Sequence, residues 1–342
     1  MSQPLIITGM HRSGTSLLAS FLQVLGVNIG ENLYEADAFN VRGYFEDVDF
    51  LEFQRGVLQK CCRCDDGGWI DWGWTESESL NREKFYEYVE DAKRLIASRD
   101  ESLSFWGWKD PRTSLMLDFW QGLLPDARYL LVYRFPWDVA DSILRLNADI
   151  FNEHPDYPLR AWAFYNRNIL DFYSRFSERC ILVNINSLLE APEVLVKLLE
   201  TKLKLKITTS TDSQKLGQLY DGNLFKSLGD SHPVVGILRQ VAPQYFALLA
   251  ELDMVADIPS AFSVGNFGGE SLPAEGLVML LHRQFLDSQR QIKNFSQQQE
   301  EKNQELQDLQ KEISAIKMSK SWKVSQGLSK LKKMLPLQGY NN

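Results

Sequence analysis

The sequence predicts an α/β fold in which helices flank a parallel sheet and a coiled-coil helix follows. Three observations predict this architecture. Short apolar runs alternate with amphipathic stretches, which is the pattern of buried strands joined by helices. A glycine-rich loop connects the first apolar run to the first amphipathic stretch. Six heptads without proline or glycine lie near the C-terminus.

Four apolar runs predict the strands of the sheet. They are Leu5–Thr8, Phe105–Trp108, Tyr129–Tyr133 and Ile181–Val183. The intervening stretches carry helical periodicity or helix-start signals, and predict helices over residues 15–25, 47–61, 81–98, 136–147 and 159–176 and from Pro192 onward. Residues 208–258 are expected to add loops and helices, so that residues 1–258 form the first domain.

The composition favours a soluble globular chain and argues against some functions. Of the 342 residues, 44% are apolar and 24% are charged, which allows one large core. The net charge of −8 argues against a nucleic-acid partner. No apolar run has the length of a signal peptide or a membrane span, so we expect a cytoplasmic protein. The four cysteines lack the matching ligands of a zinc site, and we expect reduced thiols and no metal.

Two segments after the first domain differ from it in composition. Residues 259–273 are rich in glycine, serine and proline, and predict a linker. Residues 274–318 carry a heptad repeat with a positions at Val278, Phe285, Ile292, Gln299, Leu306 and Ile313, and d positions at Leu281, Ser288, Phe295, Lys302, Leu309 and Ile316. Nine of these twelve are apolar, so we expect a coiled coil and, through it, a homo-oligomer. The alternative is one amphipathic helix folded back on the first domain.

The C-terminal tail, residues 319–342, contains lysines and no acidic residue. Trp322, Leu328, Leu331 and Leu335 are interspersed among the lysines. This pattern is typical of a basic amphipathic helix that contacts a membrane surface or an acidic partner. A solvated, frayed tail is the alternative.

The glycine-rich loop, Gly9–Ser16, lies between the first predicted strand and the first predicted helix. Glycines let the backbone turn so that successive N–H groups point at an anion, and the helix N-terminus adds partial positive charge. A nucleoside-triphosphate loop would carry a lysine where this chain has Thr15; the basic residue here is Arg12. The loop therefore predicts an anion site that lacks the usual means of cleaving a triphosphate.

Two motifs in this chain resemble those of sulfotransferases that use 3′-phosphoadenosine-5′-phosphosulfate (PAPS). Gly9-Met10-His11-Arg12-Ser13-Gly14-Thr15-Ser16 is similar to the 5′-phosphosulfate loop, in the Arg-Ser-Gly-Thr form of carbohydrate and protein-tyrosine sulfotransferases and many bacterial relatives. The stretch from Tyr133 to Ser142 is similar to the 3′-phosphate motif, although Phe135 stands where the family has Asp or His. Gly43–Glu46 and Trp106–Arg112 also look like the bacterial branch.

The resemblance implies a P-loop sulfotransferase fold, with PAPS as co-substrate and no metal. The N–H groups from Ser13 to Ser16 would hold the 5′-phosphosulfate, and Arg12 would neutralise charge as the sulfuryl bond breaks. Arg134 and Ser142 would hold the 3′-phosphate. The expected donor-binding residues are therefore His11, Arg12, Ser13, Gly14, Thr15, Ser16, Arg134 and Ser142.

The acceptor side of the site is expected to contain a general base and groups that bind a hydroxyl-bearing molecule, by resemblance a carbohydrate. Glu46 is the first candidate for the base, because relatives carry a glutamate in the same context, and Asp110 and His154 are alternatives. A solvated carboxylate or a helix cap is the plain structural reading of Glu46. The further substrate candidates are Lys109, Asp110, Arg112 and Trp72.

Plain structural roles compete with these substrate assignments, and other functions compete with sulfuryl transfer. Lys109 and Arg112 could equally brace the loop through ion pairs, and the tryptophans at 69–74 could cover the core instead of stacking on a sugar. A P-loop kinase that uses ATP is a second function, which Thr15 disfavours. A non-catalytic nucleotide-binding protein that acts through its coiled coil is a third.

Overall fold

The computed structural model describes residues 4–36, 43–63, 68–70, 73–100, 106–205, 227–229, 232–262 and 274–334. The contacts divide the chain into two compact units, Met1–Arg283 and Gln284–Asn342. The first unit contains the sheet, and the second contains most of a long helix and a shorter one that follows it.

The sheet of the first unit has four parallel strands in the order β2-β1-β3-β4. Their bounds are β1 Leu5–Gly9, β2 Gly107–Lys109, β3 Arg128–Tyr133 and β4 Cys180–Asn184. Leu5 pairs with Gly107 on one side of β1 and with Arg128 on the other, and Tyr129 pairs with Cys180. The predicted α/β fold with a parallel sheet is confirmed.

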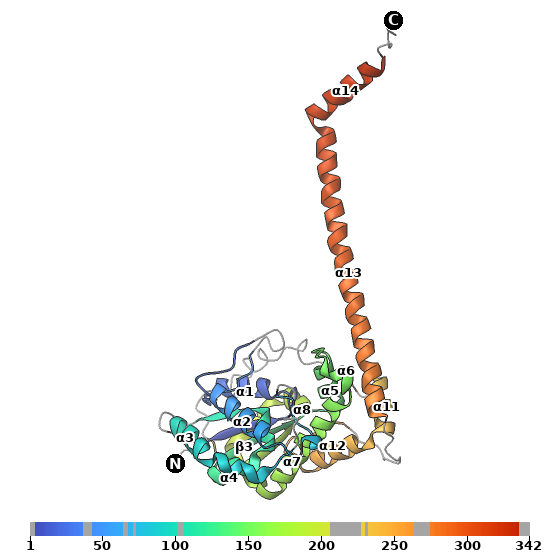
Figure 1. The fold of residues 1–342 in the computed structure, drawn as a ribbon. Helices are drawn as coiled ribbons and strands as arrows, with labels where there is room; N and C mark the ends of the chain where they lie inside the picture. Colours follow the sequence, from blue (N-terminus) through green and yellow to red (C-terminus); the bar gives the residue numbers. More distant parts are fainter. Residues whose placement is uncertain are drawn as a thin grey trace. The chain divides into compact units, whose positions relative to one another are not determined.

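Helices cover both faces of this sheet (Figure 1). Successive side chains of each strand point to opposite faces, so each strand contributes to a hydrophobic core on either side of the sheet. On one face, Ile7, Val132 and Val183 pack with buried residues of α1 (Thr15–Val24) and α9 (Pro192–Thr201). On the other face, the Tyr129 ring lies 4.8 Å from the ring of Phe172 in α7 (Tyr157–Phe176). Because both faces are buried, the strands are mostly apolar, and this made them visible in the sequence.

The remaining helices of the first unit complete the two layers. The α-helices are α2 Val48–Lys60, α3 Val89–Asp100, α4 Leu117–Leu123, α5 Pro136–Leu144, α6 Ile150–Glu153, α8 Ile185–Glu190, α11 Pro233–Val241 and α12 Pro243–Val255. The 3-10 helices are η1 Glu76–Glu78, η2 Arg82–Tyr88, η3 Pro111–Leu115 and η4 Ser177–Arg179. The helix predicted over 81–98 is therefore wrong in its first half, where the chain forms η2 before α3 begins.

Glycines at two points let β1 lie close to its neighbours. A Cβ atom on Gly107 would lie 1.9 Å from the Leu5 carbonyl oxygen, and one on Gly9 would lie 2.3 Å from that of Val132. Both obstacles are backbone atoms of the adjacent strand, which cannot move without breaking the sheet. Gly9 therefore fixes how closely the ends of β1 and β3 approach one another at the edge where the candidate site is built, and Gly107 does the same for β2 and β1 at their starts.

The long helix α13 runs from Glu275 to Met318, and α14 from Lys320 to Met334. The long C-terminal helix predicted from the heptads is confirmed; its pairing with a second chain stays a prediction. The start of α13 belongs to the first unit, because His282 Nε2 lies 2.8 Å from Asp141 Oδ1 of α5 and Arg283 donates to the Ala148 carbonyl at 3.1 Å. None of the helices that the structure describes has the length and apolarity needed to cross a membrane.

Candidate active site

Three adjacent parallel strands end at the same edge of the sheet, and each end supplies a residue of the candidate site. β2 ends at Lys109, β1 at Gly9, and β3 at Tyr133, directly before Arg134. From β1 the chain passes to β2 on one side and then returns to β3 on the other. The strand order therefore reverses beside β1, and such a switch point is where open parallel sheets bind ligands.

The loop after β1 turns back on itself through two residues with left-handed backbone conformations. Arg12 has φ of 64° and Gly14 has φ of 88°, and the Ser13 N–H donates to the Met10 carbonyl at 3.1 Å. Gly14 is the N-cap of α1, and no side chain caps this helix start. Within the described segments, no acceptor faces the N–H groups of Gly14, Thr15 or Ser16. The loop thus presents backbone donors at a helix start, as an anion site requires.

One pocket brings together most of the residues that the sequence predicted for the donor and the base. Nine predicted residues line it: His11, Arg12, Gly14, Thr15, Ser16, Glu46, Lys109, Arg134 and Ser142. The side chain of Ser13, in the same loop, is buried, and no described residue forms a hydrogen bond with its hydroxyl group. Tyr44 and Pro111 also line the pocket and were not predicted. Trp72 lies outside the described residues.

Arg12 contacts both Ser142 and Arg134 directly. Arg12 Nε donates to Ser142 Oγ at 3.0 Å, and Arg134 Nη1 donates to the Arg12 carbonyl at 3.1 Å. Burial lowers the pKa of Arg134 to about 10, with Asp138 opposing the shift from 3.7 Å, so this guanidinium is still charged at neutral pH. The two motifs of the sequence, 122 residues apart at Arg12 and Arg134, therefore form one positively charged wall.

Lys109 connects three separate segments at the pocket. Its Nζ donates to Glu46 Oε1 at 2.7 Å, to the Tyr44 carbonyl at 3.0 Å and to Ser16 Oγ at 3.2 Å. The side chain is 2% exposed, so these three acceptors replace the water that an ammonium group would otherwise bind. Lys109 thereby fixes the start of α1 and the segment that carries Glu46 in one arrangement.

Asp110 and Arg112 lie behind the pocket, where they brace it. Asp110 Oδ1 accepts from the Arg112 N–H at 2.8 Å, and Asp110 Oδ2 accepts from Gln54 Nε2 at 2.8 Å. Burial raises the pKa of Asp110 to about 6, although the Arg112 charge opposes this shift. Arg112 Nη2 donates to the Ile70 carbonyl at 3.0 Å, and neither residue lines the pocket. The bracing alternative therefore fits these two residues better than contact with substrate.

His11 lies in the pocket wall with its ring edge toward Tyr165, at a centroid distance of 5.8 Å. Burial, and then the positive charges of Arg112, Lys109 and Arg12, lower the pKa of His11 well below its ordinary value. The imidazole is therefore neutral at pH 7 and adds no charge to the pocket. Its Nε2 atom is enclosed and has no hydrogen-bond partner in the described part of the chain.

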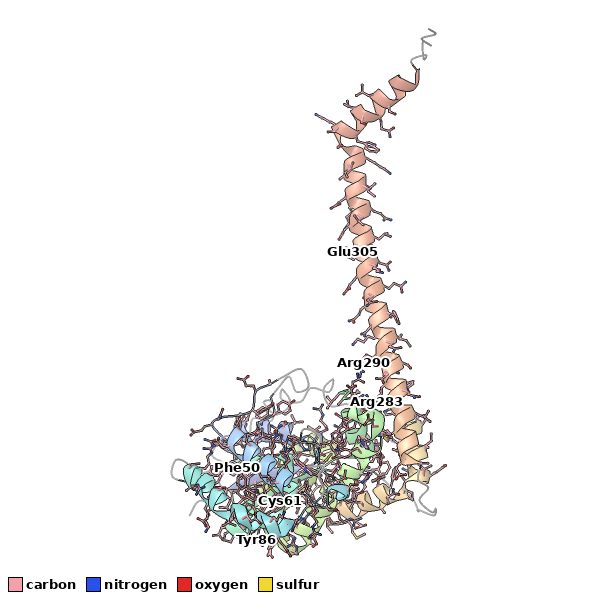
Figure 2. The ribbon with its side chains drawn as sticks, in the orientation of Figure 1. Phe50, Cys61, Tyr86, Arg283, Arg290 and Glu305 are labelled. Atoms are coloured by element: carbon pink, nitrogen blue, oxygen red, sulfur yellow. The ribbon has the colours of Figure 1, made fainter. Side chains whose placement is uncertain are left out.

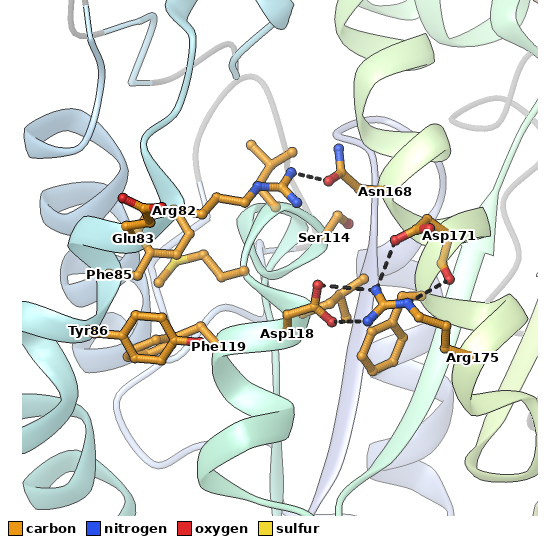
Figure 3. Close-up of a pocket in the computed structure, with 14 residues that line it drawn as sticks. Arg82, Glu83, Phe85, Tyr86, Ser114, Asp118, Phe119, Asn168, Asp171 and Arg175 are labelled. Atoms are coloured by element: carbon orange, nitrogen blue, oxygen red, sulfur yellow. Dashed lines mark hydrogen bonds and ion pairs between the residues drawn. The ribbon is translucent and has the colours of Figure 1, made fainter.

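A second pocket is lined by residues of η2, η3, α4 and α7 (Figure 3). Its charged side chains bind one another: Arg175 pairs with Asp118 at 2.8 Å and with Asp171 at 2.9 Å, and Arg82 donates to Asn168. None of the predicted site residues lines it. Nor do the segments that the structure describes contain a cluster of three His, Cys, Asp or Glu side chains placed to hold a metal ion.

Comparison with protein-family models identifies the family of this chain. Residues 4–209 match the model of the sulfotransferase family. Among solved structures, sulfotransferase STF9 from Mycobacterium avium matches with a TM-score of 0.45 and 15% identity, over 75% of this chain and 77% of its own. The sulfotransferase domain of the Synechococcus PCC 7002 olefin synthase matches with a TM-score of 0.39 and 18% identity, over 82% and 94%. A comparison with curated proteins finds no match.

The Lys109–Glu46 pair is expected to control the stability of the first unit. Lys109→Met should lower the free energy of unfolding by about 3–5 kcal/mol, because it leaves a buried carboxylate without its partner. Adding Glu46→Gln should restore a large part of that loss, since the glutamine carries no charge. Urea denaturation of the two single variants and the double variant measures this coupling. Strictly additive losses would show that the pair contributes nothing specific.

Proposed function

Because this chain belongs to the sulfotransferase family and is a sulfotransferase, we propose that it takes the sulfuryl group from PAPS and passes it to a hydroxyl group of a carbohydrate. The observation that carries the donor assignment is the single pocket at the strand ends, where the 5′-type loop and the Arg134–Ser142 motif meet. PAPS supplies an activated sulfuryl group when bound, and it carries anionic groups at both ends of its nucleotide.

The charges around the pocket suit such a double anion. Arg12, Lys109 and Arg134 are the basic side chains that line it, and Glu46 is the acidic one. Glu46 is paired with Lys109 at 2.7 Å, and Arg12 and Arg134 add two guanidinium groups to the same wall. The backbone N–H groups of Gly14, Thr15 and Ser16 add donors that need no reorganisation when an anion enters.

The contacts support a separate task for each motif. Loop N–H groups at the start of α1 would hold the 5′-phosphosulfate, with Arg12 neutralising the charge that develops as the sulfuryl bond breaks. Arg134 and Ser142 would hold the 3′-phosphate. The Ser142 hydroxyl accepts from Arg12 Nε, and a hydroxyl that accepts one bond can donate its own proton to a phosphate oxygen. Arg12 thus links the two anion sites.

Glu46 is the base that the geometry supports best. It lines the pocket, whereas both oxygens of Asp110 are occupied by Arg112 and Gln54 behind the wall. His154 is not among the lining residues; its ring lies 5.8 Å from that of Trp69. Lys109 holds Oε1 of Glu46, and Arg112 Nη1 lies 3.8 Å from Oε2. We assign to Glu46 the removal of the acceptor hydroxyl proton.

The segment around Trp69 is the candidate for the acceptor side, because Arg112 links it to Glu46. Arg112 Nη2 binds the Ile70 carbonyl, and its Nη1 lies 3.8 Å from Glu46 Oε2. None of the described residues of this segment lines the pocket itself. Trp69 is partly exposed, and its ring meets those of His154 at 5.8 Å and Tyr157 at 6.1 Å. An indole that two other rings hold in place suits stacking on a sugar ring, and this supports a carbohydrate acceptor.

Calorimetry with 3′-phosphoadenosine-5′-phosphate, ATP and 5′-AMP tests the donor assignment. We expect the 3′-phosphorylated nucleotide to bind about 100-fold more tightly than 5′-AMP, because its second phosphate meets Arg134. Arg134→Ala should remove most of that difference and leave the affinity for 5′-AMP nearly unchanged. Arg175→Ala, in the second pocket, is the matched control. A preference for ATP would instead support the kinase function.

Glu46→Gln tests the base. Loss of proton transfer should lower kcat about 100- to 10,000-fold, measured with labelled PAPS and a panel of oligosaccharides. The affinity for 3′-phosphoadenosine-5′-phosphate should stay close to that of the original chain, which separates lost chemistry from lost folding. Glu52→Gln, an exposed carboxylate of α2, is the control. Turnover near the original value would remove Glu46 from its role.

Trp69→Ala tests the acceptor class. Loss of stacking should raise the KM for an oligosaccharide acceptor about tenfold, whereas Trp69→Phe, which keeps a ring, should raise it much less. Nucleotide affinity should not change in either variant. A chain that sulfates simple phenols equally well with and without the Trp69 indole would contradict a carbohydrate site at this position.

A further inference from the structure

The long helix α13 carries one exposed apolar strip beyond its junction with the first unit. Seven large apolar residues on it are 49–69% exposed: Phe285, Ile292, Phe295, Leu306, Leu309, Ile313 and Ile316. Figure 2 shows the side chains of this helix, with Arg290 and Glu305 labelled along it. All seven occupy a or d positions of the heptad repeat, so they form one seam on the helix surface.

Three polar residues interrupt this seam: Ser288, Gln299 and Lys302. Polar residues at core positions of a coiled coil weaken it, and they also select the partner and the register in which their polar groups meet. The positions of the three polar residues therefore restrict which partner, and which register of that partner, can cover the seam. A generic apolar partner would leave the Lys302 ammonium and the Gln299 amide facing hydrocarbon.

We propose that a second copy of this chain covers the seam, in an antiparallel two-helix coiled coil of one defined register. In it Phe285 lies opposite the partner's Ile316, Ser288 opposite the partner's Ile313, and Ile292 opposite the partner's Leu309. Phe295 lies opposite the partner's Leu306, and Gln299 opposite the partner's Lys302. The paired stretch is about 47 Å long at 1.5 Å per residue.

This register follows from three properties of the seam. All ten a and d positions from Phe285 to Ile316 find a partner within the same set, as a two-fold symmetric interface requires. Its limits also match the chain, because the second unit begins at Gln284 and α13 ends at Met318. Most of the apolar positions meet apolar ones, and the Lys302 ammonium can donate to the amide oxygen of the partner's Gln299.

Other registers bring the lysine against apolar or positive groups. A shift of one heptad in the antiparallel pair puts Lys302 opposite the partner's Ile292 or, in the other direction, the partner's Leu306. A parallel pair in register puts Lys302 opposite the partner's Lys302, so that two like charges share one buried layer. That pair would gain Glu312 beside the partner's Lys317, but a rim ion pair in water contributes little.

The residues that flank the seam accept the antiparallel arrangement without charge conflict. The e and g positions are mostly uncharged, with Glu305 and Glu312 among the g residues. In the proposed register Glu305 lies beside the partner's Gln298, and Glu312 beside the partner's Gln291. Since no like charges meet at the rim, the pairing of Gln299 with the partner's Lys302 decides between the orientations.

Disulfide formation in the full-length chain distinguishes the orientations. We expect the double variant Phe295→Cys/Leu306→Cys to form a covalent dimer on mild oxidation, because each new thiol faces the other one across the interface. Either single variant should remain unlinked. In a parallel pair, the new cysteine of each single variant would face the same cysteine of the second chain and would cross-link. Cross-linking of the single variants would overturn the proposal.

Two controls complete the experiment. The double variant Gln297→Cys/Gln304→Cys places thiols that are level with each other in the proposed register but lie on f positions, which face outward, so it should not cross-link. The unchanged chain controls for its own cysteines. Sedimentation equilibrium should give twice the mass of one chain, and Leu306→Asp should reduce it to one. A single-chain mass at every concentration would overturn the proposal, as would a double variant that stays unlinked.

Discussion

The buried ammonium of Lys109 is the interaction on which the candidate site depends. It lies at the end of β2, beside the loop that follows β1, and satisfies its three donors on Ser16, Tyr44 and Glu46. A charge in such a place is stable only if every acceptor stays where it is. The donor loop and the proposed base belong to segments far apart in the chain, and this one group fixes them relative to each other.

A second constraint is the excess of positive charge between Arg12 and Arg134. The carbonyl of Arg12 accepts from Arg134, and Asp138, at 3.7 Å, provides partial compensation. Burial shifts the pKa of Arg134 downward, which means that the charge is costly while no anion is bound. Binding of an anion would relieve that cost, so the burial that makes the Arg134 charge costly also favours an anionic ligand.

The sequence was sufficient to predict the strands, the position of the glycine-rich loop and most of the residues that line the pocket. It was insufficient to identify the residues that hold those lining residues in place. The buried parallel strands are mostly apolar, and the loop needs Gly14 at a positive φ, so both leave a clear pattern. Tyr44 takes part through its carbonyl oxygen, which any residue would supply, so no pattern could identify it. Asp110 and Arg112 are charged residues of the kind that often bind substrate. Only their contacts with Gln54 and Ile70 indicate a bracing role.

The start of α13 and the donor pocket share one structural element. Asp141 of α5 binds His282, and the next residue, Ser142, accepts from Arg12. Because both contacts are made by neighbouring residues of one helical turn, a displacement of the first turns of α13 would move Ser142 as well. Pairing of two chains through α13 would therefore load the helix that carries Ser142. The start of α13 also packs against Asp156, which precedes the Tyr157 ring that contacts Trp69, so the first turns of the long helix contact elements that carry or support both Ser142 and Trp69.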